Sequence, residues 1–181
     1  AQATPSLWSI LQSNGSMPPI KVLVGGEALN IETAKSLATL GPVINLYGPT
    51  EATIWASSHE VGTSFDPNVE QNAVVSIGKP LPSYSIFILD SGLELVPPGA
   101  IGEIYIAGPS LARGYIGKGG MTSERFVACP MGPPGSLMYR TGDLGRLSIH
   151  GEIEFLGRAD DQVKIRGHRI ELGEIESAAL N

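Results

Sequence analysis

An apolar strand–helix–strand pattern near the N-terminus restricts the fold more than any other feature of this sequence. Residues 20–24 and 43–47 are short apolar runs that both lead into glycine, as buried strands do where they enter loops. Between them, Asn30 precedes a helical apolar pattern over residues 31–40, and Gly41 follows its end. A strand, a helix and a strand in this order form a βαβ unit, so the sequence predicts a parallel sheet in an α/β fold.

The sequence pattern changes after about residue 62, where glycine, proline, asparagine and aspartate turns separate short apolar runs. In this later part, strands are predicted over residues 84–89, 103–107, 137–140, 146–149 and 153–155, with a short helix over 122–127. Another short helix is predicted near the start of the chain, over residues 6–12. The last stretch predicts a hairpin of residues 162–165 and 168–171, followed by a helix that opens at Leu172. We therefore expect an α/β part, then antiparallel sheet or a small barrel, then the beginning of a third unit.

Charge and cysteine content argue against several classes of protein. The net charge of −6 is unlike that of a general nucleic-acid or membrane-surface binder, which is normally basic. Cys129 is the only cysteine, so neither an internal disulfide nor a cysteine-based zinc site is possible, and we expect a reducing, cytoplasmic location. No apolar run approaches the length of a membrane span, and the start has no signal-peptide pattern. Because the chain lacks an initiator methionine and stops at Asn181 soon after a predicted helix begins, we expect an excised piece of a larger protein.

The first motif with chemical potential is Asn45-Leu46-Tyr47-Gly48-Pro49-Thr50-Glu51. It follows a buried strand, and open α/β sheets bind ligands at the carboxyl ends of their strands. The ring of Tyr47 can stack on a planar base, and Asn45 offers both a donor and an acceptor. Thr50 can hydrogen-bond a phosphate oxygen, and Glu51 can hold a magnesium ion that neutralises phosphate charge. The alternative is a strand that ends in an ordinary Gly-Pro turn.

The second and third motifs lie in the β-rich part. The second covers residues 102–108 and continues through 111–115; it is rich in glycine and has no evident catalytic group, so we predict a structural role. The third, Tyr139-Arg140-Thr141-Gly142-Asp143-Leu144, has Asp143 at the end of a short predicted strand. There its carboxylate can accept hydrogen bonds from two ribose hydroxyls, as the acidic residue of dinucleotide folds does. The alternative is an Asx-type turn.

The fourth motif is the longest and covers residues 157–176. It is locally basic in an acidic chain, with Arg158, Lys164, Arg166 and Arg169 against Asp160 and Asp161. These side chains could meet phosphate groups, or they could belong to a solvated hairpin. Glu171, Glu174 and Glu176 near the start of the next helix would complement its dipole, which is a structural role.

These four segments, in this order and spacing, resemble the adenylate-forming, AMP-binding superfamily, and within it the amino-acid adenylation domains of nonribosomal peptide synthetases. The resemblance runs from about Ile20 to the end of the chain. Acyl-CoA synthetases share the Gly-Arg-x-Asp element but usually lack the continuation over residues 169–176. The resemblance implies the C-terminal part of a flavodoxin-like α/β nucleotide and substrate subdomain over 1–62 and a β-rich, barrel-like subdomain over 63–159. Residues 160–181 would form a hinge and the beginning of a mobile C-terminal α+β subdomain.

The family reaction has two steps. An amino-acid carboxylate attacks the α-phosphorus of ATP, which releases pyrophosphate and leaves an aminoacyl-adenylate, and the phosphopantetheine thiol of a carrier protein then takes the acyl group. The resemblance thus implies a cytoplasmic, Mg²⁺- and ATP-dependent ligase of secondary metabolism and antibiotic biosynthesis. Its implied partners are the amino acid, a peptidyl carrier protein domain and a neighbouring condensation domain, with no nucleic acid and no membrane.

The resemblance also implies a role for each matching residue. Thr50 and Glu51 would be the catalytic residues facing the phosphates, with Glu51 on the metal ion, and Asp160 would be the hinge. Tyr47 would stack on adenine, and Asp143 would bind the ribose hydroxyls with help from Arg158. The implied nucleotide-binding set is Gly25, Gly26, Glu27, Asn45, Tyr47, Gly48, Thr50, Asp143 and Arg158.

Part of an amino-acid pocket is implied in the same way. Gln2, Leu23, Gly25, Leu46, Ile54 and Trp55 would line it. The aliphatic residues make it largely apolar, Gly25 leaves depth, Trp55 closes one side, and Gln2 is the lone polar group. These features favour a medium or large substrate side chain with one hydrogen-bonding group. For Trp55 and Leu46 the alternative is ordinary core packing.

Some family elements are expected outside this chain. The phosphate-binding loop with its lysine, and the aspartate that pairs with the substrate's α-amino group, would precede Ala1, and the catalytic lysine would follow Asn181. We therefore expect the intact domain to be an enzyme and this piece alone to be incompetent. Two other interpretations stay open: a stand-alone acyl- or aryl-CoA synthetase, which the last motif disfavours, and a nonenzymatic nucleotide-binding or docking module. Against the second stand the intact residues Tyr47, Thr50, Glu51, Asp143 and Arg158.

Overall fold

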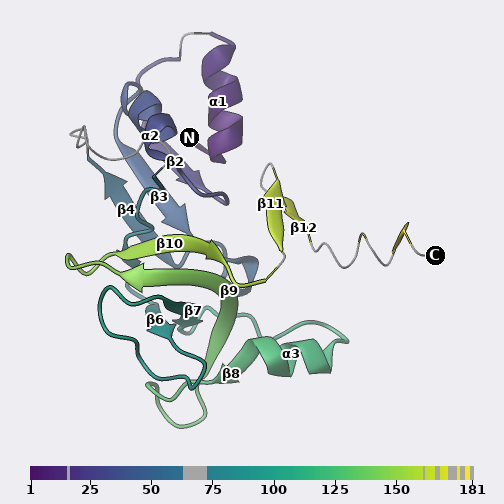
Figure 1. The fold of residues 1–181 in the computed structure, drawn as a ribbon. Helices are drawn as coiled ribbons and strands as arrows, with labels where there is room; N and C mark the ends of the chain where they lie inside the picture. Colours follow the sequence, from purple (N-terminus) through teal and green to yellow (C-terminus); the bar gives the residue numbers. More distant parts are fainter. Residues whose placement is uncertain are drawn as a thin grey trace.

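A computed structural model describes residues 1–15, 17–62, 73–160 and 162, the backbone of 163–165 and 168–170, and residues 175, 178 and 179. The described residues form two five-stranded sheets and a short hairpin. In Figure 1 the α/β part, coloured purple to blue, lies above the β-rich part, and strand β10 runs between them. The mixed α/β class and the succession from α/β to mostly β are confirmed.

The first sheet contains the predicted βαβ unit. Its strands are β1 (Gln2–Ala3), β2 (Val22–Gly25), β3 (Val43–Tyr47), β4 (Ser57–Val61) and β5 (Lys79–Pro80), in that spatial order. Strands β2 and β3 are parallel, as predicted, and β1, which was not predicted, is parallel to β2. Strands β4 and β5 are each antiparallel to the strand before them. We did not predict β4, because its sequence Ser-Ser-His-Glu-Val is too polar to stand out as a strand. The first sheet thus continues past residue 62, where the composition changes.

Both helices of this part cover one face of the sheet. They are α1 (Pro5–Ser13) and α2 (Ile31–Ala38), near the ranges predicted for them. The side chain of Asn30 accepts a hydrogen bond of 2.7 Å from the amide of Thr33, which confirms it as the cap of α2. Trp8 from α1 and Leu37 from α2 are fully buried against Val22 and its neighbours. Burial of each such side chain contributes about 1.5–3 kcal/mol.

Strand alternation divides the residues of β3 between the two faces. Val43, Asn45 and Tyr47 point to the side on which the helices and the core lie, so Leu46 points to the other side. Two register pairs, Gln2 with Leu23 and Gly25 with Leu46, then lie on that other side. Asn45 and Tyr47, predicted to bind the nucleotide, therefore lie on one face of the sheet, and the strand residues predicted for the amino-acid pocket lie on the other: Gln2, Leu23, Gly25 and Leu46.

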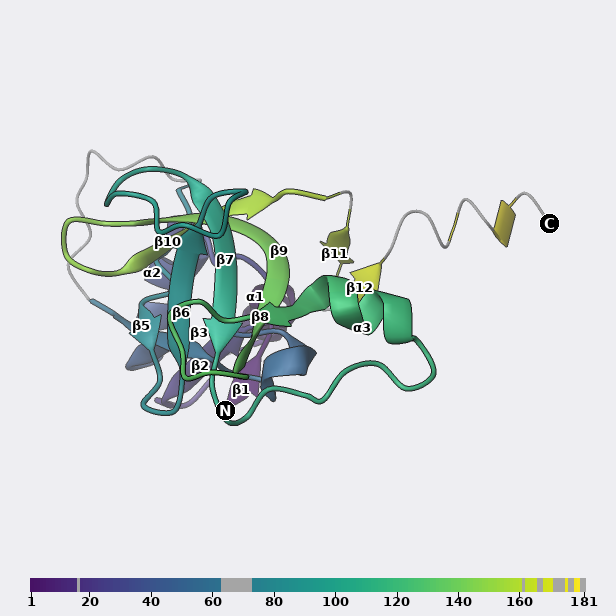
Figure 2. The ribbon, with the colours of Figure 1, turned by 90° about the horizontal axis from the view of Figure 1, so that it is seen from below.

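The second sheet is antiparallel, with the order β10-β9-β7-β6 and β8 paired to β9. Its strands are β6 (Ser85–Leu89), β7 (Gly102–Ala107), β8 (Phe126–Ala128), β9 (Leu137–Leu147) and β10 (Ile153–Arg158). Figure 1 shows β9 bending sharply along its length, and Figure 2 views the curled sheet from below. The prediction of a small barrel-like antiparallel part is confirmed as a curled sheet.

Two element predictions in this part were wrong. Residues 137–140 and 146–149 do not form separate strands, because the chain stays paired from Leu137 to Leu147 through a local bulge. Helix α3 (Gly119–Arg125) begins and ends earlier than predicted, and Phe126 is already extended. Phe126 is buried and its ring lies 5.1 Å from that of Tyr139, so packing on β9 ends the helix.

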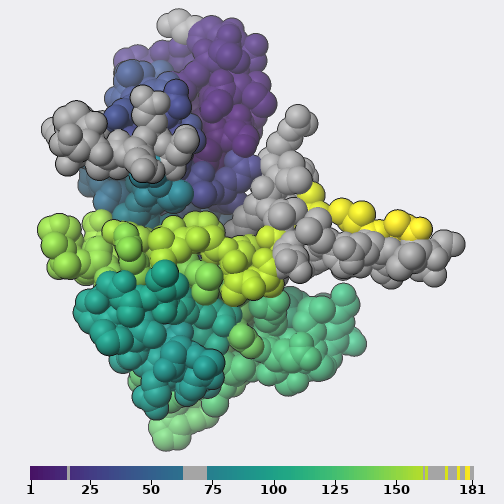
Figure 3. Space-filling view, viewed as in Figure 1, coloured from purple at the N-terminus to yellow at the C-terminus, as the bar shows by residue number. Residues whose placement is uncertain are grey.

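The two sheets are joined at the carboxyl ends of the first. Ile153 of β10 exchanges backbone hydrogen bonds of 2.8 and 2.9 Å with Gly78 and Ile77, just before β5. Tyr47 and Ala52 share a buried cluster with Ile104 of β7. The space-filling view in Figure 3 shows β10 as a continuous band between the two parts. The end of β3 is therefore enclosed by the β-rich part.

The predicted terminal hairpin is present. It consists of β11 (Val163–Ile165) and β12 (His168–Ile170), which are antiparallel. Of the helix predicted from Leu172, only Ile175, Ala178 and Ala179 are described, and all three have helical backbone. Leu172 and the charged residues Asp161, Arg166 and Glu171 lie outside the described residues.

Candidate nucleotide-binding site

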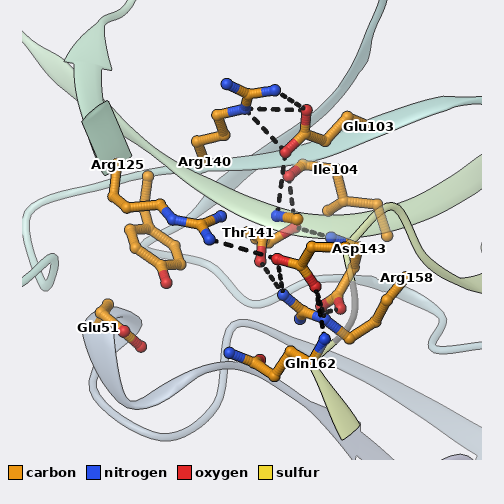
Figure 4. A network of polar contacts seen from close by, with 12 residues as sticks. Glu51, Glu103, Ile104, Arg125, Arg140, Thr141, Asp143, Arg158 and Gln162 are labelled. Atoms are coloured by element: carbon orange, nitrogen blue, oxygen red, sulfur yellow. Dashed lines mark hydrogen bonds and ion pairs between the residues drawn. The ribbon is translucent and has the colours of Figure 1, made fainter. Parts of the chain in front are cut away.

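Three predicted nucleotide-binding side chains from three strands meet where the two sheets join. The hydroxyl of Tyr47 donates a 2.5 Å hydrogen bond to Asp143 Oδ2, and Arg158 Nη1 donates a 2.7 Å bond to Oδ1. All three side chains are largely buried, with Asp143 only 2% exposed. Burial and the charge of Asp143 raise the pKa of Tyr47, which therefore remains a neutral donor. Figure 4 shows Asp143 and Arg158 within this network.

Irregular strand pairing places Asp143 and Arg158 opposite each other. The register between β7 and β9 shifts between Glu103 and Tyr105, and that between β9 and β10 shifts between Phe155 and Gly157. Bulges of this kind re-aim side chains next to functional sites. Asp143 therefore lies within a long strand rather than at the end of a short one, which corrects our prediction.

Gly142 is essential to this irregularity. Its φ of +77° lies in the left-handed region, and a Cβ at this position would lie 2.6 Å from Arg158 Nη2 and 2.8 Å from Asp160 Oδ2. The neighbouring Thr141 stabilises the bulge, because its hydroxyl donates to the carbonyl of Ile104 and accepts from the amide of Asp143. Thr141 and Gly142 thus act locally to direct the Asp143 carboxylate inward.

The ion-pair network continues to Asp160, the predicted hinge. Arg158 Nε and Nη2 donate to its two carboxylate oxygens at 2.6 and 2.7 Å, and Arg125 Nη2 lies 3.3 Å from Oδ2. Partial burial would raise the pKa of Asp160, but the hydrogen bonds and charges of Arg158 and Arg125 outweigh it and lower the pKa to about 2. The Arg125 link, from the last residue of α3, was not predicted.

This pKa gives a pH prediction. A carboxylate with a lowered folded-state pKa contributes stability that is present above its unfolded-state pKa of about 3.9 and is lost as the pH falls toward the folded value. In the wild type, we expect hydrogen exchange of the segment around residues 158–160 to accelerate as the pH falls from about 4 toward 2, after correction for intrinsic rates. The Asp160→Asn variant should lose most of this extra acid dependence; an unchanged pH profile would contradict the assignment.

Thr50 and Glu51 lie on a 3-10 turn, η1 (Thr50–Ala52), directly after β3. Thr50 is exposed, whereas Glu51 is only 6% exposed and its Oε1 accepts a 2.6 Å hydrogen bond from the hydroxyl of Tyr115. Among the described residues, no three His, Cys, Asp or Glu side chains gather closely enough to hold a metal ion. One carboxylate fits Mg²⁺ held mainly by substrate phosphates and water, which is this ion's usual mode of binding.

A cleft opens beside Tyr47. Most of its lining comes from the predicted nucleotide-binding segments, together with the stretch before β5 and one aromatic of β10: Gly26, Glu27, Ala28, Leu29, Asn45, Leu46, Tyr47, Gly48, Val74, Val75, Ile77 and Phe155. Glu27 is held by Ser6, whose hydroxyl and amide both donate to it. The Asn45 amide donates to the carbonyl of Ser76 at 2.9 Å. Hydrogen bonds to Ser6 and Ser76 thus hold the side chains of Glu27 and Asn45 in the lining of the cleft.

Our sequence reasoning missed Phe155. Its ring lies 6.5 Å from that of Tyr47, at an interplanar angle of 41°, so the two aromatic rings flank the cleft. In a regular strand Phe155 and Arg158, three residues apart, would point to opposite faces. The irregularity between Phe155 and Gly157 breaks this alternation, so no local signal identified Phe155. The stretch 74–77 could not be found either, because its position depends on pairing between distant strands.

The predicted pocket residues lie near one another, but the space above Gly25 is filled. The ideal position of a Cβ at residue 25 is 2.5 Å from two ring atoms of Trp55 and 2.7 Å from the carbonyl of Leu46. The depth expected at Gly25 is therefore taken by the Trp55 ring. Thr53 and Ile54 precede it with φ of 53° and 79°, and β-branched residues rarely adopt positive φ. This unusual turn directs Trp55 onto Gly25 and leaves Ile54 59% exposed.

Comparison with known proteins decides the family. The family described as AMP-binding enzyme matches residues 1–116, well over half of the chain. The chain belongs to the AMP-binding enzyme family. It is 48% identical over 183 residues to a dimodular nonribosomal peptide synthase of Bacillus subtilis, a match that covers 99% of this chain and 7% of that protein. It is 43% identical to surfactin synthase subunit 3 of the same bacterium, covering 96% of this chain and 14% of that one.

Solved structures agree with the assignment of this chain to the AMP-binding enzyme family. One is a nonribosomal peptide synthetase protein with adenylation and carrier (PCP) domains bound to a vinylsulfonamide inhibitor, with 30% identity and a TM-score of 0.86. Another is the Vibrio cholerae adenylation domain AlmE with glycyl-adenosine-5′-phosphate, with 32% identity and a TM-score of 0.82. They cover 99% and 97% of this chain, which spans 32% and 34% of theirs. The chain is thus part of an adenylation domain of the nonribosomal peptide synthetase type. In its described part, no helix is long and apolar enough to cross a membrane.

Proposed function

We propose that this chain supplies the adenine and ribose sites, and part of the amino-acid pocket, of a domain that activates an amino acid with ATP. The carboxylate of the amino acid would attack the α-phosphorus, release pyrophosphate and form an aminoacyl-adenylate. The observation that carries the proposal is the meeting of Tyr47, Asp143 and Arg158 beside a cleft at the carboxyl end of β3. Ligands of open α/β sheets bind at such ends. Relatives that are peptide synthetases support the amino-acid substrate.

In the proposed complex the adenine lies between the rings of Tyr47 and Phe155, and the ribose hydroxyls bind Asp143. An ionised carboxylate has about four acceptor positions, and Tyr47 and Arg158 use two of those on Asp143. Two ribose hydroxyls can therefore bind without displacing the protein donors. Arg158 orients the carboxylate, which prepares the site before the nucleotide arrives.

Thr50 and Glu51 are proposed to face the phosphates. Thr50 offers an exposed hydroxyl at the start of η1, and Glu51 offers the buried carboxylate that would hold a magnesium ion. When bound, the ion would neutralise phosphate charge as pyrophosphate leaves. The side chains of Gln2, Leu23, Leu46, Ile54 and Trp55 are proposed to contact the amino acid from the opposite face of the sheet.

The second half-reaction involves parts outside the described residues. We propose that Asp160 is the hinge about which a C-terminal subdomain turns, so that the phosphopantetheine thiol of a carrier protein can take the acyl group. Support comes from its place at the end of β10, where a salt-bridge network with Arg158 and Arg125 holds one conformation. The solved relative with adenylation and carrier domains supports a carrier protein as partner. This chain alone is proposed to be inactive.

Amino-acid-dependent exchange of labelled pyrophosphate into ATP tests the proposal. The longer protein that carries this chain should catalyse the exchange with one or a few amino acids among the common and several nonproteinogenic ones. Absence of exchange with every amino acid, from a folded protein that still binds ATP, would refute amino-acid activation. Fatty, aryl and hydroxy acids tested in the same assay would then distinguish an acyl- or aryl-CoA synthetase.

A further inference from the structure

The glycine-rich motif at residues 111–115, predicted above to be structural, reaches the proposed metal ligand. The hydroxyl of Tyr115 donates to Glu51 Oε1 at 2.6 Å, although the two residues are 64 positions apart in the chain. In the same loop, the amide of Ala112 donates to the backbone carbonyl of Glu51 at 2.7 Å. One loop therefore holds both the side chain and the backbone of Glu51.

Tyr115 is itself held firmly. Its amide donates to the Thr122 hydroxyl at 2.9 Å, its ring packs edge-on against Phe126 at 5.8 Å, and its hydroxyl lies 3.3 Å from that of Tyr139. Gly114 before it has φ +136°, and a Cβ there would collide with Thr122. The hydroxyl of Tyr115 is thus in place before any ligand binds.

Two further bonds tie the η1 turn to the β-rich part. The Tyr84 hydroxyl donates to the carbonyl of Ala52 at 2.6 Å, and the Thr53 hydroxyl donates to the carbonyl of Ser110 at 2.5 Å. The first acts on the backbone of the turn, and the second acts through the side chain of Thr53, which follows the turn. The bond from Tyr115 differs from these two, because it acts on the Glu51 carboxylate itself.

We propose that Tyr115 is a positioning residue that orients the Glu51 carboxylate toward a magnesium ion on the bound nucleotide. The inference rests on the proposed function of Glu51. A hydroxyl donor fixes the rotation of a carboxylate and takes up part of the charge on one oxygen, and loss of such supporting bonds typically weakens metal binding about 10–100-fold. Burial and the bond to Glu51 raise the pKa of Tyr115, so it stays protonated as a donor at all working pH values.

A purely structural role for Tyr115 is the competing explanation, and Tyr105 provides the matched control. Its hydroxyl donates to Glu103 Oε2 at 3.4 Å, and the residue is 3% exposed in the second sheet. Tyr105→Phe and Tyr115→Phe each remove one hydroxyl from a largely enclosed tyrosine–carboxylate pair. Only the second pair contains the proposed metal ligand.

The experiment measures the affinity of the longer protein for α,β-methylene-ATP by titration calorimetry with and without Mg²⁺. This analogue cannot transfer its adenylyl group, because a methylene group replaces the oxygen between the α- and β-phosphorus atoms. The ratio of the two affinities reports the contribution of the metal ion without requiring turnover. We expect Tyr115→Phe to lower this ratio about 10-fold while the metal-free affinity stays the same. Tyr105→Phe should leave the ratio at the wild-type value, and Glu51→Gln should lower it at least as much as Tyr115→Phe.

The double variant Tyr115→Phe with Glu51→Gln makes the test sharper. If Tyr115 acts through Glu51, the double variant should show no more loss than Glu51→Gln alone, since coupled residues are not additive. Fully additive losses, or a Tyr115→Phe ratio equal to that of the wild type, would overturn the inference and leave the proposed function standing. A wild type without any Mg²⁺ effect on analogue binding would instead contradict the proposed role of Glu51.

Discussion

Replacing Arg158 with methionine should lower the free energy of local opening of β9 and β10 by about 3–5 kcal/mol, because it leaves two carboxylates without their main cationic partner. Arg158 is 11% exposed and bonds Asp143, Asp160 and the carbonyl of Thr141. Methionine keeps much of the aliphatic volume, so the loss reports charge and hydrogen bonding rather than a cavity. Hydrogen exchange of peptides from β9 and β10 in the longer protein measures it directly.

Arg140→Met is the matched control for this prediction. Arg140 also pairs with a carboxylate on the same sheet, that of Glu103, but its side chain is 50% exposed. Solvent-exposed pairs contribute about 0–1 kcal/mol, so exchange of the same peptides should change little. Equal effects of the two substitutions would show that burial of the Arg158 network adds nothing to the stability of the two strands.

The same network shows which parts of the structure could be predicted from the sequence. The βαβ unit was predictable because local apolar periodicity and the Asn30 cap both specify it. The long course of β9 was not, because its bulge at Gly142 depends on contacts with β7 and β10. Strand β4 has a polar sequence and becomes a strand through pairing with β3. Local patterns identified elements, and tertiary pairing determined where they continue.

The candidate site divides in the same way. Tyr47, Asp143 and Arg158 stood out as residue types in motifs, and the structure brings them together. Phe155 and Tyr115 were missed or taken as structural, since each gains its place from a partner far away in the chain. A side chain whose role is to hold another residue leaves a weak signal in a single sequence, because its partner is not adjacent.

The largest expected loss of nucleotide binding comes from Asp143→Asn. Asparagine has one acceptor oxygen and an amide donor that would face Arg158 or the ribose hydroxyls, so it cannot satisfy Tyr47, Arg158 and the ribose together. We expect about 100-fold weaker binding of α,β-methylene-ATP, which corresponds to ~2.7 kcal/mol. Titration calorimetry on the longer protein measures the change, with circular dichroism to verify that the variant is folded.

Asp90→Asn is the isosteric control for Asp143→Asn. A second variant, Tyr47→Phe, separates the contribution of the Tyr47 hydroxyl to nucleotide binding from that of the Asp143 carboxylate. Asp90 accepts hydrogen bonds from the amides of Gly92 and Glu94 in an exposed turn after β6, so its replacement should leave nucleotide affinity unchanged. Tyr47→Phe removes one donor to Asp143 but keeps the aromatic face and the carboxylate, and should weaken binding much less than Asp143→Asn. If folded Asp143→Asn bound the analogue within about threefold of the wild type, a difference of less than ~0.7 kcal/mol, the ribose would have to bind elsewhere. Asp143 would then serve only to neutralise Arg158 between the two sheets.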